Sequence, residues 1–131
     1  MSKDLTDLQL LTAKLEQLIQ RHPVVADYGA WLQIRILHEH SDLHGVVRVG
    51  HRALARDPDT PLAPEIHERM GDALMTLGDG RSAQASWRRA LDESRDGALR
   101  ARVLLSIGAA EERAGLDDEA VQQLRKNGAV S

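Results

Sequence analysis

The chain has 131 residues, a formal net charge of −3 and no cysteine. This length fits one domain with a buried core, and the missing cysteines exclude disulfides, thiol chemistry and cysteine-ligated zinc. The acidic balance argues against nucleic acid as a partner. The start MSKDLTDLQLL contains acids, so it predicts no signal peptide, and the lack of any long apolar run predicts no membrane span. We therefore expect a cytoplasmic location.

Residues 3–21 are predicted to form the first helix. Its apolar residues recur at three- and four-residue spacing and form one stripe: Leu5, Leu8, Leu11, Leu15, Leu18 and Ile19. A helix with one apolar stripe and a polar back suits the cap at the end of a stack of helices. Leu10 lies off the stripe, either as an isolated exposed leucine or as part of a contact between two copies.

A second helix is predicted from about Asp27 to His40, and it is apolar almost all round. The stripe expected to be buried consists of Ala30, Ile34, Ile36 and Leu37. The residues that point largely elsewhere are Tyr28, Trp31, Leu32 and Arg35. Trp31 and Tyr28 therefore have two interpretations: they line a binding surface, or they pack beneath the first helix.

Three histidines, His38, His40 and His44, crowd the turn that follows. Imidazoles can bind a transition metal, but this spacing crosses a helix–turn–helix junction and matches no known metal signature. We interpret these histidines as solvated turn residues, and we expect no metal and no cofactor.

Residues 64–93 read as two helices joined by the turn Gly78-Asp79-Gly80, after a link whose two prolines, Pro58 and Pro61, prevent a continuous helix. The apolar face of the first helix carries Ile66, Met70, Ala73, Leu74 and Leu77, and that of the second carries Ala83, Trp87, Ala90 and Leu91. Neither helix is long enough to be stable alone, so each apolar face must be covered by its neighbours.

A period of 37 residues relates this hairpin to the sequence on either side. Small turn residues recur at Ser41, Gly78 and Gly115, and the last of these predicts a break before a final helix from Asp117 to about Lys126. Three further sets recur with the same period: Ile34, Gly71 and Gly108; Ile36, Ala73 and Ala110; Val46, Ala83 and Ala120. A fixed period of this size indicates stacked supersecondary units.

The pattern resembles the tetratricopeptide repeat, which has a large–small pair in its first helix and an Ala–aromatic–Ala pattern in its second. Those places are taken by Met70-Gly71, Leu74, Ala83, Trp87 and Ala90. Segment 41–58 resembles the second helix of the repeat with its Asp-Pro ending. Segment 107–124 resembles the turn of the repeat with its flanking residues. The sequence departs from the family pattern in three ways. Its period is 37 residues, whereas that of the family is about 34. Gly50 stands where the family has a large residue, and Glu111 stands where it has an aromatic one.

The resemblance implies an all-α, right-handed α-solenoid of about three helix-turn-helix hairpins with an N-terminal capping helix, about seven helices in all. Residues 1–131 then form a single domain, divided into the capping helix 3–21 and repeats 25–57, 62–95 and 98–126.

In such a stack the first helices of the hairpins line a concave groove. The groove residues implied here are Tyr28, Trp31, Leu32, Arg35, Glu68, Arg69, Asp72, Met75, Arg102 and Leu105. A groove of this composition suits a peptide or a partner helix. Because the chain has no phosphate loop, zinc motif or nucleophile elbow, we expect a non-catalytic protein–protein interaction module. The alternative is a structural module that forms a homodimer through the concave face or the first helix.

Overall fold

The computed structural model describes residues 3–21 and 26–127, with side chains 6–17 in the first helix and 26–127 thereafter. The described chain is helical and contains six helices: α1 Lys3–Arg21, α2 Ala26–Glu39, α3 Leu43–Arg56, α4 Ala63–Thr76, α5 Gly80–Glu93 and α6 Gly97–Lys126. Within this part of the chain, no helix is both long and apolar enough to cross a membrane.

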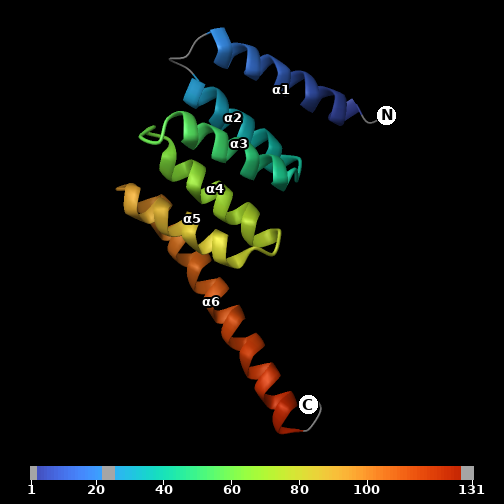
Figure 1. Ribbon diagram of the computed structural model, residues 1–131, viewed down its shortest axis with the longest axis vertical. Coiled ribbons are helices and arrows are strands. Elements are labelled where there is room, and N and C mark those ends of the chain that lie inside the picture. The colour runs from blue at the N-terminus through green and yellow to red at the C-terminus, as the bar shows by residue number, and fades with distance from the viewer. Residues whose placement is uncertain (1–2, 22–25, 128–131) are drawn as a thin grey trace.

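The helices lie side by side in chain order, and each packs against the next (Figure 1). Two further contacts join α2 to α4 and α4 to α6. The second half of α6 leaves this array and projects away from the other helices (Figure 1).

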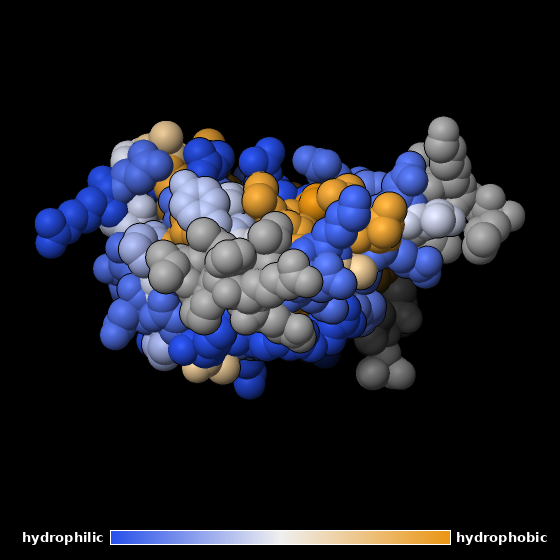
Figure 2. All heavy atoms as spheres, turned by 90° about the horizontal axis from the view of Figure 1, so that it is seen from above, coloured by the Kyte–Doolittle hydropathy of each residue, from blue (hydrophilic) through white to orange (hydrophobic). Residues whose placement is uncertain are grey.

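Helix α1 has the predicted bounds, but its apolar stripe is covered only in part. Leu15 is buried, whereas Leu11, expected in the buried stripe, is 45% exposed. The cause is that α1 contacts α2 and no other described helix. Viewed from the α1 end, hydrophobic side chains lie at the surface among hydrophilic ones (Figure 2). The predicted burial of Leu5, Leu18 and Ile19 concerns side chains outside the described set.

The two tight turns are closed by left-handed residues followed by aspartate caps. Ser41 has φ 59° and Gly78 has φ 90°. In the first turn the carboxylate of Asp42 accepts a hydrogen bond from the Gly45 amide at 3.0 Å, and in the second Asp79 accepts from the Ser82 amide at 3.2 Å. Each cap satisfies one of the amides left free at the start of the following helix, and the predicted Gly-Asp-Gly turn is confirmed.

Two adjoining clusters form the core. The first joins α2, α3 and α4, and the second joins α5 and α6 with Leu74 and Met75 of α4. In α2, α4 and α5 the predicted burial is confirmed for nine positions: Ala30, Ile34, Leu37, Ile66, Met70, Ala73, Ala83, Trp87 and Ala90. Leu77 is 37% exposed, so its predicted burial is wrong. Leu77 is the residue after the end of α4, and the turn residues that follow it, Gly78 and Asp79, are exposed.

The predicted third hairpin is wrong, and the described chain has six helices in place of the expected seven. Residues 97–126 form one continuous helix, which starts at an Asp96 cap and passes through Gly115 without a break. Gly115 is followed by a leucine, not by the Asp-Gly pair that follows Gly78. A single glycine inside a helix costs about 1 kcal/mol relative to alanine, which is too little to end the helix.

Candidate functional site

The predicted groove residues come from α2, α4 and α6, the three helices joined by contacts between alternate elements. We call this surface the α2–α4–α6 face. Five of its residues are exposed: Tyr28, Leu32, Arg35, Arg102 and Leu105. Four are half-buried, namely Trp31, Arg69, Asp72 and Met75, and Glu68 is buried. The structure therefore joins some of these side chains in pairs and leaves the three outer apolar ones open to solvent.

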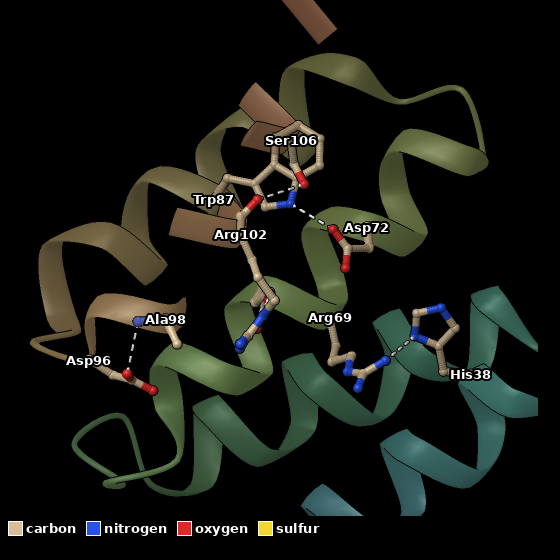
Figure 3. Close-up of polar contacts among 9 residues, drawn as sticks. His38, Arg69, Asp72, Trp87, Asp96, Ala98, Arg102 and Ser106 are labelled. Carbon is tan, nitrogen blue, oxygen red and sulfur yellow. Dashed lines mark hydrogen bonds and ion pairs between the residues drawn. The ribbon is translucent and has the colours of Figure 1, made fainter. Parts of the chain in front are cut away.

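Arg69 connects α4 to α2 through two contacts. Its guanidinium carbon lies 5.7 Å from the centroid of the Trp31 ring, a cation–π distance. Its Nη1 atom is 3.1 Å from Nδ1 of His38 (Figure 3). Because a guanidinium only donates, Nδ1 of His38 must be the acceptor and carry no proton. His38 thus belongs to this face, a role that its place among three turn histidines did not indicate.

Glu68 and Arg102 connect α4 to α6 through a two-pronged ion pair. Nε and Nη2 of Arg102 donate to the two carboxylate oxygens of Glu68 at 2.9 and 3.0 Å. The hydrogen bond and the charge of Glu68 both raise the pKa of Arg102. Since Glu68 is only 8% exposed, its carboxylate is held under Arg102 and is not presented to a partner. The predicted groove position of Glu68 is therefore a helix-joining position in the structure.

Asp72 forms one wall of a cavity of about 340 Å³ between α4, α5 and α6. Burial raises its pKa, although the hydrogen bond from Trp87 Nε1–H to its Oδ1, 3.1 Å long, opposes this shift (Figure 3). The sequence pattern placed Trp87 in the core and gave no sign that its polar edge reaches this face.

Two hydroxyl groups also line the cavity. Ser106 donates to the carbonyl of Arg102 at 3.1 Å, and Thr76 donates to the carbonyl of Asp72 at 3.2 Å. Each hydroxyl is thus bound to a backbone carbonyl of its own helix, and neither is hydrogen-bonded to a side-chain base.

The turn histidines do not come together as a set. His40 bonds through Nδ1 to the carbonyl of Ile36 at 2.9 Å, while His38 faces Arg69. Across residues 6–17 and 26–127, no group of three or more His, Cys, Asp or Glu side chains is arranged to hold a metal ion.

Comparison of the chain with protein-family models, with curated proteins and with solved structures gives no match in any of the three. The chemistry of the α2–α4–α6 face must therefore follow from its own side chains. Tyr28 is 65% exposed and Leu105 75% exposed, which are large values for apolar side chains. No carboxylate in the described part of the chain lies within 4.0 Å of the guanidinium of Arg35 or Arg69. The face thus offers apolar contacts beside two arginines, Arg35 and Arg69, that have no carboxylate partner among the described residues.

Proposed function

We propose that this protein is a non-catalytic interaction module, built as a right-handed stack of tetratricopeptide-like helix pairs, that binds a peptide or partner helix across the α2–α4–α6 face. The observation that carries the proposal is the asymmetry of the helix contacts. The first helices α2, α4 and α6 contact one another in turn, whereas α3 and α5, among the described elements, do not. Helices that approach one another line the inner side of a curved stack, and those that separate line the outer side.

The side chains of the α2–α4–α6 face suit a partner that has both apolar and acidic groups. Leu32 and Tyr28 lie exposed on α2, and Leu105 lies exposed on α6. Between them, the Arg69 guanidinium is held in place by Trp31 and His38. A held cation recognises a carboxylate at a smaller entropic cost than a free side chain does, and exposed aromatic and aliphatic residues are the usual anchors of such contacts.

The test is a selection of peptides from a random peptide library displayed on phage, followed by calorimetric titration of the selected peptides. We expect Trp31→Ala and Arg69→Glu each to weaken binding at least about tenfold, the size expected when one good anchor is lost. Arg48→Glu is the matched control, because Arg48 is an exposed arginine on the outer helix α3. The proposal fails if every selected peptide binds both face variants as tightly as the wild type, or if Arg48→Glu weakens binding equally.

A further inference from the structure

Helix α6 carries a stripe of apolar residues that is interrupted by the acid Asp117, and only the first half of this stripe is covered. At alternating four- and three-residue steps the stripe consists of Val103, Ile107, Ala110, Ala114, Asp117, Val121 and Leu124. Val103 is buried in the α5–α6 cluster, and Ile107 and Ala110 pack against it. Every residue from 111 to 127 is exposed. This spacing is the one that two helices use when they pack side by side, so the second half has the pattern of a helix seam and no partner.

A wide cleft opens where α6 diverges from α5. Its volume is about 1150 Å³, and its walls come from the start of α5, the α4–α5 turn and the middle of α6. Three arginines line it, Arg81, Arg88 and Arg113, against one acid, Asp117. None of the three guanidinium groups lies within 4.0 Å of a carboxylate in the described part of the chain. Ala110 and Ala114 of the α6 stripe also line it, so the lining combines three cations and one acid with small apolar side chains.

The projecting half of α6 has an acidic start and two apolar side chains that complement this cleft, and it ends with the basic pair Arg125 and Lys126. It begins with three consecutive acids, Asp117, Asp118 and Glu119, and continues with Val121 and Leu124, which are 42% and 45% exposed. Asp117 already lines the cleft of its own copy, but a continuous helix cannot bring Val121 and Leu124 into that cleft. Val121 is eleven residues beyond Ala110, which is about 16 Å along the axis at 1.5 Å per residue.

A second copy of the same helix meets no such obstacle. When two α6 helices run antiparallel, the free half of each lies beside the cleft of the other, so both clefts are filled by one two-fold arrangement. When Val121 of one copy is level with Ala110 of the other, Leu124 is level with Ile107 and Asp118 is level with Arg113, so the acids of one copy lie on the arginine side of the other copy's cleft.

We propose that this protein forms a two-fold homodimer through α6, in which residues 117–126 of each copy occupy the cleft between α5 and α6 of the other. This interface is separate from the α2–α4–α6 face and does not depend on the function proposed for that face.

The first test is sedimentation velocity of the full chain over a dilution series. We expect a monomer–dimer equilibrium in the wild type, and a dimer at least about 100-fold weaker in the double variant Val121→Glu/Leu124→Glu, because two large apolar contacts are lost. Leu116→Glu is the control, since Leu116 is also exposed on the projecting half but lies off the stripe. A wild type that is monomeric at every concentration, or a Leu116→Glu variant as weak as the double variant, overturns the proposal.

A charge exchange tests the register of the two copies. Arg81→Glu/Arg88→Glu gives a copy with an acidic cleft and an acidic free half, and Asp117→Lys/Asp118→Lys gives the converse, so neither is expected to pair with itself. Mixed together, they restore both opposite-charge contacts and should form a heterodimer. Failure of the mixture to associate, while both variants keep the wild-type helical circular dichroism, overturns the assignment of the cleft.

Crosslinking distinguishes a second copy from a tail that folds back at Gly115. The chain has no native cysteine, so Ala110→Cys/Val121→Cys contains one cysteine pair, too far apart along a continuous α6 for a disulfide. Oxidation should give a covalent dimer on a non-reducing gel, and mixing the two single variants should give the heterodimer. A disulfide confined to the monomer band would show a fold-back hairpin and overturn the proposal, and so would the absence of any disulfide.

Discussion

The packing of Trp87 on Gly71 offers a sharp test of how α4 and α5 fit together. A Cβ atom added at Gly71 would lie 2.3 Å from Cδ1 and 2.4 Å from Nε1 of the Trp87 indole. The indole is 2% exposed, and its Nε1–H donates to Asp72 at 3.1 Å. It therefore cannot move aside without losing both its packing and its hydrogen bond. We expect Gly71→Ala to destabilise the protein even though alanine is the better helix former.

The expected size of this effect is the balance of three contributions to the free energy of unfolding. Replacing a helical glycine by alanine stabilises by up to about 1 kcal/mol. Forcing an extra methyl group into a packed site costs about 1–3 kcal/mol, and the broken hydrogen bond to a carboxylate adds roughly 1.5 kcal/mol. The net destabilisation is about 1.5–3.5 kcal/mol. At a urea dependence of about 2 kcal/mol/M, the unfolding midpoint should fall by about 0.8–1.8 M.

The chain supplies its own control one period further on. Gly108 occupies the equivalent position in α6, but an added Cβ there meets nothing within 4 Å. We expect Gly108→Ala to stabilise by about 0.5–1 kcal/mol, since only the helix preference of alanine remains. Both variants are measured by urea unfolding followed by far-ultraviolet circular dichroism. If Gly71→Ala matches the wild type or Gly108→Ala, Trp87 does not pack on Gly71 as described.

Three further substitutions follow from the ionisable groups. Arg102→Met should destabilise the protein by about 1–2 kcal/mol, which is less than for a fully buried ion pair because the Arg102 side chain is 56% exposed. In a double-mutant cycle measured by urea unfolding, adding Glu68→Gln should recover most of this loss. Additive effects of the two substitutions would contradict the pairing. Burial raises the pKa of Asp72 above 3.8, so its contribution to stability is full below pH 3.8 and lost as the pH rises through the raised pKa. Asp72→Asn should flatten this part of the pH dependence of the unfolding free energy, and an unchanged slope would argue against a buried carboxylate. Burial outweighs the nearby Glu93 and lowers the pKa of His67 below 6.5, so its contribution is full above pH 6.5 and lost as the pH falls through the lowered pKa. His67→Gln should abolish that loss in melting temperatures taken from pH 7 to pH 5, and a variant that still follows the wild type would exclude His67 as its source.

The hairpin of α4 and α5 was predictable because every local feature of its sequence agrees. Pro64 lies at the start of α4, the turn has a glycine able to adopt φ 90°, and Asp79 caps the next helix. The apolar residues on either side recur at helical spacing and face one another. When helix start, turn and periodicity all indicate the same structure, the sequence leaves little choice.

The same reasoning gave a wrong prediction for residues 97–126. A sequence period predicts that equivalent positions have the same structure, but the local sequence decides whether they do. Gly115 falls in register with Gly78 but has no Asp-Gly after it, and the ten residues from 117 to 126 offer only Val121 and Leu124 as large apolar groups. Folding this segment back would break helical hydrogen bonds around Gly115 and bury two side chains in return. A continuous α6 keeps those hydrogen bonds and leaves the two side chains exposed.

The α2–α4–α6 face shows where the limit of prediction lies in a stack of helices. Periodicity assigns each residue to a side of its helix, and so it brought Trp31, Arg69 and Arg102 to one surface. It carries no information on which side chains meet across neighbouring helices, because that depends on the separation and tilt of the helix axes. Arg69 reaches back to α2, whereas Glu68, its neighbour in sequence, reaches forward to α6. These two adjacent residues therefore hold three helices together.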